Sequence, residues 1–309
     1  MESETGPGVQ SVICFGHNVR GLRDEKLEEL VEHMKVRKMW TYAVQETWRE
    51  SDFQLESGGY LFINHGYPER RCNRGSGGVG FVLSPDARKA WEAAGSKVMY
   101  FGERIVAIKL RLMDMDGRDV DVMLVSAYAP IGASLVAERE KFLSELVECE
   151  GACGEKTVWL ASIDANAALG TKRGAKDLVL GPSGNTWVNK AGKLMYQVLA
   201  ENRLVSCASF FIRKTWYNSW FNPCNRLGYQ LDHWLVRRKD LKRVRGCWVD
   251  SKQTVESDHS PVGFKLNISR RRPGNRLRRP QEGGKKKGKV DRRKLLTPEG
   301  KESFVEAVE

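Results

Sequence analysis

The sequence predicts an α/β protein in which two packed β-sheets carry helices on their outer faces. Short apolar runs with the composition of β-strands outnumber amphipathic helical segments, and the helical segments are inserted between them. The 309 residues suit one large domain or two small ones, with a sizeable core. The sequence shows no internal repeat of about 20–50 residues, the signature of solenoids and propellers.

The N-terminal part of this domain begins with a buried strand at residues 11–18, and an amphipathic helix follows. Four apolar side chains of that helix share the i, i+3, i+4, i+7 spacing of one face: Leu27, Leu30, Val31 and Met34. Asp24 is the predicted N-cap of this helix. Residues 42–47 read as the next strand, which places Glu46 at its end.

The middle of the domain contains a predicted β-hairpin. Residues 105–112 and 120–128 favour β-structure, and a turn with glycine at residues 114–118 separates them. Residues 157–163 form another apolar strand, and this strand ends at Asp164.

The remaining predicted elements are two helices and three strands. The helices are residues 134–149, with Phe142, Leu143, Leu146 and Val147 on the apolar side, and residues 193–202. The strands are residues 78–83, 229–236 and 261–268.

Charge is distributed unevenly along the chain, whose net charge is +12. From residue 270 onward 14 Lys or Arg stand against 6 Asp or Glu, and the remainder has 37 against 33. We therefore expect a flexible N-terminus at residues 1–10, a globular domain at residues 11–268, and a basic linker or tail at residues 269–309. The tail is expected to be largely disordered, with a short C-terminal helix where Phe304 and Val308 are four residues apart. Such a tail is typical of a polyanion-binding protein, although charge runs are as often only solvated.

The composition argues against a membrane-spanning or secreted protein. No apolar run approaches the ~20 residues of a membrane helix, and the acidic start of the chain does not resemble a signal peptide. The seven cysteines are odd in number and irregular in spacing, as in a reduced intracellular protein. Cys149 and Cys153 are four residues apart, but no further zinc ligands lie near them in the sequence.

Polar residues recur at the ends of the apolar strands, where a rigid sheet aims several side chains at one point. They are Asn18, Glu46, Tyr128, Asp164, Asn166, Asp232, Asp258 and His259. Carboxylate oxygens bind hard divalent cations, an acid–base group activates water, and fixed donors stabilise the charge that develops on a phosphate. This set of residues therefore indicates hydrolysis of a phosphodiester.

With these motifs the chain resembles the endonuclease/exonuclease/phosphatase superfamily, and within it the endonuclease domain of LINE-type (non-LTR) retrotransposon polyproteins. The resemblance runs from about residue 13 to residue 264. It rests on six motifs in order: Asn18-Val-Arg-Gly-Leu, Gln45-Glu-Thr-Trp, Tyr128-Ala-Pro, Asp164-Ala-Asn, Tyr229-Gln-Leu-Asp-His-Trp and Ser257-Asp-His-Ser-Pro-Val. It implies the DNase I-like fold, a four-layer sandwich of two mixed, mostly antiparallel β-sheets packed face to face with helices on the outer faces.

The resemblance implies a metal site and its ligands. Glu46 would hold Mg²⁺, with Asp258 helping through water and Asn18 as a further metal-site residue. Mn²⁺ is the alternative ion, because carboxylate and amide oxygens suit either. Asn18 would also donate a hydrogen bond to a phosphate oxygen, and its alternative is a simple turn residue.

The same resemblance implies the catalytic residues. Asp164 would orient or deprotonate the attacking water. His259 would contact the scissile phosphate, and Asp232 would fix the tautomer of its ring and raise its pKa. Asn166 and Tyr128 would donate hydrogen bonds to phosphate oxygens.

Four further residues are expected to contact the substrate: Thr215, Trp216, Arg20 and Arg74. Thr215 and Trp216 resemble the retrotransposon branch. Arg20 stands where repair-type relatives carry an acid, a departure common in that branch, and it weakens a repair role. Arg74 belongs to a basic loop that either grips phosphates or is merely solvated. Trp220 and Phe221, close to Trp216, either form a hairpin that enters a DNA groove or pack in the core.

The implied function is metal-dependent nicking of DNA, which leaves a 3′-hydroxyl to prime reverse transcription of a retrotransposon. The expected partners are DNA and, through the basic tail, the RNA of the element itself. The protein is expected to be monomeric, with no membrane partner, and to act inside the cell in the nucleus. Two alternatives stay open: another phosphodiesterase of the superfamily, such as a repair nuclease or a deadenylase, and a domesticated nucleic-acid-binding protein without catalysis.

Overall fold

The computed structural model describes residues 9–67, 77–131, 136–174, 176–211, 218–251 and 255–269. Contacts between Cα atoms divide the chain into two units, Met1–Arg270 and Arg271–Glu309. The second unit, which contains most of the expected basic tail and the expected short helix, lies outside the described residues. Residues 1–8 of the expected flexible N-terminus also lie outside them. Among the helices described, none is both long and apolar enough to cross a membrane.

The larger sheet has seven strands in the order β14-β15-β1-β2-β5-β4-β3. These are β1 (Ser11–Asn18), β2 (Thr41–Gln45), β3 (Phe53–Ser57), β4 (Tyr60–His65), β5 (Val79–Leu83), β14 (Val244–Val249) and β15 (Val262–Asn267). The strands β1 and β2 are parallel, and the other neighbours are antiparallel. The sheet is therefore mixed and mostly antiparallel, as predicted.

The smaller sheet has six strands in the order β10-β13-β9-β8-β7-β6. These are β6 (Val98–Tyr100), β7 (Ile105–Met113), β8 (Asp119–Tyr128), β9 (Val158–Asp164), β10 (Leu204–Ser206) and β13 (Asp232–Arg237). Here β8 and β9 are the parallel pair. The short strands β11 (Trp220–Phe221) and β12 (Gly228–Tyr229) form a separate antiparallel hairpin.

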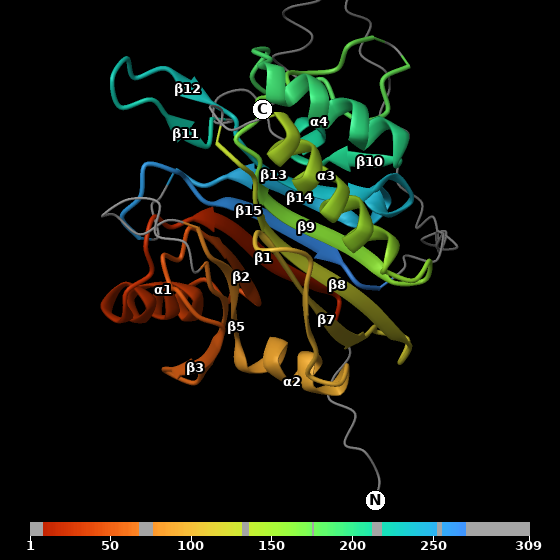
Figure 1. Cartoon of the computed structure of the whole chain (residues 1–309). Helices are drawn as coiled ribbons and strands as arrows, with labels where there is room; N and C mark the ends of the chain where they lie inside the picture. The colour runs from red at the N-terminus through yellow and green to blue at the C-terminus, as the bar shows by residue number, and fades with distance from the viewer. Residues whose placement is uncertain are drawn as a thin grey trace, which may run out of the picture. The chain divides into compact units, whose positions relative to one another are not determined.

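Helices cover the outer faces of both sheets (Figure 1). The helices are α1 (Asp24–Val36), α2 (Pro85–Ala93), α3 (Val136–Gly151), α4 (Lys190–Glu201), α5 (Ala208–Phe211) and the 3₁₀ helix η1 (Arg238–Arg243). The apolar face of α1 packs with residues of the larger sheet, and those of α3 and α4 pack with the smaller one. The predicted face of α1 is the buried one, because its four apolar side chains follow the helical period.

The main core lies between the two sheets. Phe264 of the larger sheet stacks on Trp234 of the smaller one, with ring centroids 4.8 Å apart, and Trp91 of α2 packs into the same core. Strands covered on both faces read as continuous apolar runs, which explains why β2, β5 and β9 are recognisable in the sequence. The helix–sheet–sheet–helix layers confirm the predicted α/β sandwich.

Two local predictions are wrong. The expected strand at 229–236 is broken, because Ser219 Oγ accepts hydrogen bonds from the backbone N–H groups of Leu231 and Asp232. Tyr229 therefore belongs to the small hairpin, and β13 begins at Asp232. The N-cap of α1 is Arg23, and Asp24 is the first residue of the helix, where it forms an ion pair with Arg49.

Candidate active site

The strand ends that carry the predicted site residues meet at one edge of the sandwich. Asn18 at the end of β1 is the register partner of Gln45 at the end of β2. In the other sheet, Tyr128 of β8 and Asp232 of β13 are both register partners of Asp164. Parallel strands end on the same side of a sheet, so the parallel pair in each sheet brings two of these ends together.

His259 lies between two buried carboxylates. Its Nδ1 atom is 2.9 Å from Asp232 Oδ2, and its Nε2 atom is 3.9 Å from Asp164 Oδ2. Because Asp232 engages Nδ1, Nε2 is the ring nitrogen that faces Asp164. Burial opposes a charge on this ring, but the carboxylates of Asp232 and Asp164 outweigh it and raise the pKa of His259 to about 10. The imidazole is therefore protonated at neutral pH.

Asp164 is the carboxyl group with a pKa suited to proton transfer. Burial, followed by the negative charge of Asp232, raises the pKa of Asp164 to about 7, against the opposing charge of His259. Its Oδ1 atom accepts a hydrogen bond from the backbone N–H of Asn166 at 3.0 Å, and its Oδ2 atom accepts one from Asn18 Nδ2 at 2.8 Å. A general base works best when its pKa lies near the operating pH.

The amide of Asn18 links Asp164 to Glu46. Its Nδ2 atom also donates to Glu46 Oε1 at 2.7 Å, while its Oδ1 atom accepts from the backbone N–H of Arg20 at 3.1 Å. That second contact fixes the orientation of the amide, so a donor nitrogen faces the carboxylates where a metal ligand needs an oxygen. Trp48 Nε1 donates a hydrogen bond to the other carboxylate oxygen of Glu46, Oε2, at 3.1 Å. The backbone of Glu46 lies in the left-handed region, with a φ of +53°.

Asp258 and Arg20 are paired with one another. Asp258 Oδ2 accepts hydrogen bonds from Arg20 Nη1 at 2.9 Å and from Trp220 Nε1 at 3.1 Å. Its Oδ1 atom is buried and has no hydrogen-bond partner among the described residues. The Arg20 side chain keeps 44% of its surface exposed. Asp258, which was predicted to help bind the metal, is therefore bonded directly to Arg20, which was predicted to bind the substrate.

Tyr128 and Asn166 lie beside Asp164. Burial, followed by the carboxylates of Glu46 and Asp164, raises the pKa of Tyr128 far above its usual value, so the phenol keeps its proton and is a donor. Asn166 has a φ of +45°. Its Nδ2 atom donates to the carbonyl of Ala129 at 3.0 Å, which uses one of its two amide hydrogens.

A buried arginine that the sequence reasoning missed holds two of the loops at this edge. Arg139 of α3 donates to three carbonyl oxygens, those of Pro130 at 2.6 Å, Ile131 at 3.1 Å and Ala165 at 3.3 Å. The first two follow the strand end at Tyr128, and the third follows Asp164.

Arg139 is only 7% exposed. Burial lowers the pKa of Arg139, and the negative charge of Asp164 opposes this shift. The sequence contains one signal that Arg139 is buried: it lies on the i, i+3, i+7 face of α3 together with Phe142 and Leu146. A charged residue on an apolar helix face needs buried partners.

The backbone of His259 is held by two side chains. His17 Nε2 donates to the His259 carbonyl at 2.9 Å, and Tyr42 OH lies 3.2 Å from His17 Nδ1. Burial lowers the pKa of His17 to about 4, so this ring is neutral. Ser257 Oγ accepts from the His259 N–H at 3.1 Å and donates to the Asn18 carbonyl at 2.7 Å.

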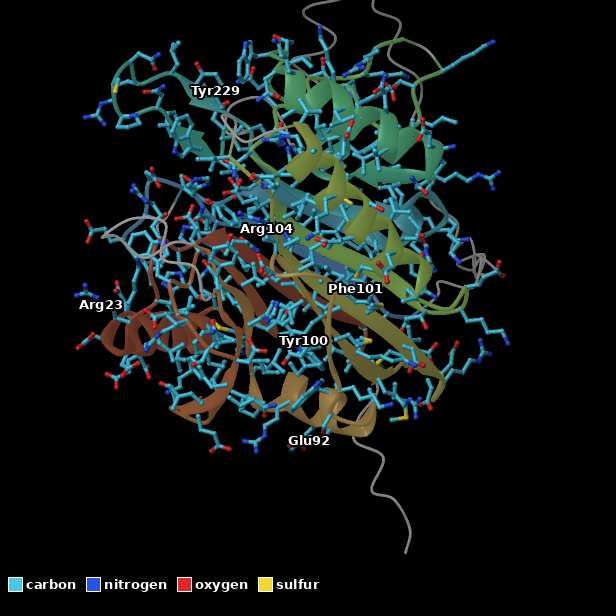
Figure 2. The ribbon with its side chains drawn as sticks, in the orientation of Figure 1. Arg23, Glu92, Tyr100, Phe101, Arg104 and Tyr229 are labelled. Atoms are coloured by element: carbon cyan, nitrogen blue, oxygen red, sulfur yellow. The ribbon has the colours of Figure 1, made fainter. Side chains whose placement is uncertain are left out.

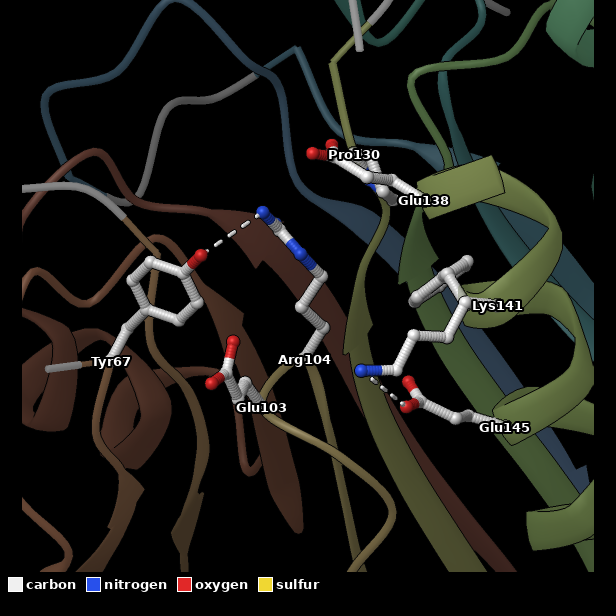
Figure 3. Close-up of a pocket in the computed structure, with 8 residues that line it drawn as sticks. Tyr67, Glu103, Arg104, Pro130, Glu138, Lys141 and Glu145 are labelled. Carbon is white, nitrogen blue, oxygen red and sulfur yellow. Dashed lines mark hydrogen bonds and ion pairs between the residues drawn. The ribbon is translucent and has the colours of Figure 1, made fainter. Parts of the chain in front are cut away.

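A pocket lined by charged residues of both signs adjoins the site on the side of Tyr128. The Arg104 guanidinium lies over the rings of Tyr128 and Tyr67, at 5.6 Å and 5.2 Å from their centroids. Figure 3 shows Arg104 directed toward the Tyr67 hydroxyl, to which Nη2 donates at 3.4 Å. The pocket is completed by Glu103, Pro130, Glu138, Lys141, Phe142 and Glu145.

The carboxylate oxygens of this site fit a hard divalent cation, whereas the protonated His259 ring has no lone pair for one. Oxygen and nitrogen atoms of Asp164, Asp232 and His259 lie within 4.8 Å of one another, the one such group found in the part of the chain that the structure describes. The Oδ1 atom of Asp232 is buried without a hydrogen-bond partner there. An unpaired buried carboxylate oxygen is costly, and a cation near it removes that cost. Glu46 adds a further carboxylate through Asn18.

Some predicted residues lie outside the described ranges. Thr215 and Trp216 fall in residues 212–217, and Arg74 falls in residues 68–76, so their substrate contacts stay predictions. Cys149 and Cys153 are both buried free thiols, and no metal-binding group among the described residues includes them.

No protein-family model and no curated protein matches the sequence. Solved structures do match it. The AP endonuclease LMAP from Leishmania major has a TM-score of 0.61 and 16% identity, over 84% of this chain and 89% of that one. The endonuclease domain of TRAS1, a telomere-specific non-LTR retrotransposon, has a TM-score of 0.55 and 16% identity, over 84% of this chain and 100% of that one.

A third similar structure is the 3′-5′ exonuclease NExo from Neisseria meningitidis, with a TM-score of 0.58 and 16% identity over 83% of this chain and 100% of that one. At this identity the similarity establishes the fold. The chain has the DNase I-like α/β sandwich, and the three structures compared are named as nucleases.

Proposed function

We propose that this protein is a divalent-metal-dependent nuclease that hydrolyses phosphodiester bonds in DNA. The observation that carries this proposal is the arrangement of His259 between Asp232 and Asp164, with Glu46 joined to Asp164 through Asn18. It combines a protonated donor, a carboxyl group with a pKa near neutrality and a further carboxylate for a cation. The nucleases with the same fold support it.

In this mechanism Asp164 orients the attacking water and accepts its proton. The water oxygen bonds to phosphorus, the P–O3′ bond breaks, and the leaving 3′ oxygen takes up a proton from solvent. General-base help of this kind contributes about 10²–10⁴ in rate. His259 directs its protonated Nε2 toward the phosphate and stabilises the negative charge that develops there. Asp232 keeps the ring in place and favours its charged form.

Neutral donors complete the site. Tyr128 keeps its phenolic proton, and Asn166 has one amide hydrogen left after its bond to Ala129. Asn166 therefore donates to a non-bridging phosphate oxygen, and Tyr128 does so when its hydroxyl turns from Glu46 to the phosphate. Asn18 acts by positioning, because its amide nitrogen holds the carboxylates of Glu46 and Asp164 at a fixed separation.

Glu46 would be the principal ligand of Mg²⁺ or Mn²⁺, with the carboxylates around His259 close by. When bound, the ion polarises the phosphate and offsets its charge. Asp258 would help through water, and its Oδ2 atom is engaged by Arg20 and Trp220.

The finer proposal is a DNA-nicking endonuclease that supplies a 3′-hydroxyl primer for a LINE-type retrotransposon. Its support is the set of motifs specific to that branch, Arg20 among them, and the structural similarity to the TRAS1 endonuclease domain. Within this proposal the protein acts in the nucleus as a monomer, and its basic C-terminal segment contacts the RNA of the element.

Nicking of supercoiled plasmid tests the proposal. The wild-type chain with Mg²⁺ should convert supercoiled to relaxed plasmid, and EDTA should abolish the conversion. Asp164→Ala and His259→Ala should each lose it at a temperature at which circular dichroism shows that the variant is folded. DNA binding without any metal-dependent cleavage would instead favour a non-catalytic nucleic-acid-binding protein.

A second candidate is a repair nuclease, which the similarity to the Leishmania AP endonuclease favours. A duplex with one abasic site separates the two candidates. Cleavage confined to the abasic position supports repair, and nicking of intact plasmid at a comparable rate supports the retrotransposon role.

A further inference from the structure

A row of aromatic rings leads away from His259 across the surface. Trp220 of β11 lies 6.3 Å from the His259 ring, Tyr229 of β12 lies 5.8 Å from Trp220, and Trp187 lies 4.7 Å from Tyr229, centroid to centroid. Trp187 is 46% exposed, whereas Trp220 and Tyr229 are half-buried. We call Trp187, Tyr229 and Trp220 the aromatic platform.

The platform is held by a side chain that joins two loops distant in sequence. Asn185 Nδ2 donates to Asn218 Oδ1 and to the carbonyl of Gly228, both at 2.9 Å. Asn185 Oδ1 accepts from the backbone N–H of Trp187 at 2.9 Å. The loop that carries Trp187 is therefore fastened to the β11–β12 hairpin, so the exposed indole is presented in a defined position.

The charge around the platform suits a polyanion. Neither of the two segments that build it, residues 181–190 and 218–229, contains an acidic residue. Each contributes one exposed cation, Lys190 and Arg226. The acid bonded to the platform is Asp258, which accepts from Trp220 Nε1 and is paired with Arg20. An exposed aromatic on segments that carry cations and no acid is the composition of a surface that stacks nucleobases and contacts their phosphates.

We propose that the aromatic platform binds a nucleobase that has left the base stack, next to the phosphate that His259 contacts. This inference rests on the proposed nuclease function and adds a substrate preference to it. In an intact duplex the faces of the bases are covered by their neighbours. A ring such as Trp187 therefore gains stacking only where a base is unpaired or the duplex is kinked.

The preference predicted is for DNA with unpaired bases at the binding site. A strand that contains 2-aminopurine reports this directly, because the fluorescence of this base falls when it stacks. Full-length protein in EDTA, which prevents metal-dependent cleavage, is titrated onto a duplex with a short 2-aminopurine bubble and onto the fully paired duplex. The wild type should bind the bubble more tightly and quench its fluorescence.

Trp187→Ala and Trp187→Leu should weaken bubble binding by about 5- to 100-fold and remove the quench, whereas Trp187→Phe should retain it. Leucine keeps apolar bulk without a stacking face, so it serves if the alanine variant does not fold. The matched control is Tyr100→Ala, an aromatic that is 47% exposed on β6 and lies in another region of the molecule (Figure 2).

Three outcomes overturn the inference: equal affinity of wild type for bubble and paired duplex, unchanged affinity in both Trp187 variants, or an equal loss in Tyr100→Ala. The result is distinguishable from failure of the proposed nuclease, since the titration needs no cleavage. If the protein nicks plasmid and Trp187→Leu binds the bubble as tightly as the wild type, only the proposal of the aromatic platform is contradicted. If the quench depends on Trp187 but the protein does not nick plasmid, only the proposed nuclease function is contradicted.

Discussion

Asp232 on β13 is the antiparallel register partner of Asp164 on β9, and His259 lies between their carboxylates. Two buried acids therefore lie on either side of one imidazole. The negative charge of Asp232 raises the pKa of both Asp164 and His259. Removing that single charge should therefore shift two titrations in the same direction.

The first prediction concerns pH dependence. Nicking needs ionised Asp164 and protonated His259, so the wild-type rate should rise with pH through about 7 and fall through about 10. Asp232→Asn removes a negative charge, which eases ionisation of Asp164 and disfavours the imidazolium. Both limbs of the profile of kcat/KM should therefore move to lower pH, with a lower maximum.

The control for this profile is Asp52→Asn. It breaks an exposed Asp–His pair with the same 2.9 Å separation, at His65, and should leave both limbs in place. An alkaline limb that stays where it is in Asp232→Asn would show that His259 is not the group that titrates there.

The second prediction concerns the metal. Glu46→Gln keeps an acceptor oxygen and the size of the side chain, but it removes a negative charge. The Mg²⁺ concentration for half-maximal nicking should rise by at least ~10-fold, the smallest effect typical of losing even an outer-shell partner of a metal ligand. Saturating Mg²⁺ should restore part of the rate.

The control is Glu92→Gln, because Glu92 is an exposed residue of α2 (Figure 2), and this variant should need the same Mg²⁺ concentration as the wild type. If the Mg²⁺ concentration for half-maximal nicking is unchanged in Glu46→Gln, Glu46 is not the ligand.

The third prediction concerns Arg139. Arg139→Met leaves the carbonyls of residues 130, 131 and 165 without their donor, which should lower the free energy of unfolding by about 1–3 kcal/mol. The same loops carry Tyr128 and Asp164, so kcat should fall while KM for DNA changes little. Urea unfolding and nicking kinetics below the melting transition measure the two effects. Arg139→Lys should recover part of each, and lost stability with an unchanged kcat would limit Arg139 to a structural role.

The fourth prediction concerns Arg20, which either contacts a phosphate or only pairs with Asp258. Because its side chain is 44% exposed, we expect a phosphate contact. Arg20→Ala should then weaken DNA binding at low salt and reduce the slope of log K against log salt by about 1. Filter binding across a salt series measures this slope. The control is Arg88→Ala, because Arg88 of α2 is likewise paired with acids, Glu56 and Glu92. If the slope is unaltered in Arg20→Ala, Arg20 pairs with Asp258 and does not contact a phosphate.

Local sequence patterns were enough to predict much of the fold. The apolar runs of β1, β2, β8, β9 and β15 are legible because these strands are buried over most of their length. The edge strand β3 was missed, since its side chains are mostly exposed and show no apolar alternation. The strand predicted at residues 229–236 was wrong because its break depends on Ser219, a contact between separate segments.

By itself the sequence determined which polar residues stand at strand ends, since burial and periodicity along one strand are local properties. Only the tertiary structure decided how these ends face one another. The pairing of β1 with β2, and of β9 with β8 and β13, joins segments far apart in the chain. The direction of the Asn18 amide, the Arg20–Asp258 pair and the burial of Arg139 follow from those long-range contacts. No local pattern encodes them, because each depends on partners that only folding brings within hydrogen-bonding distance.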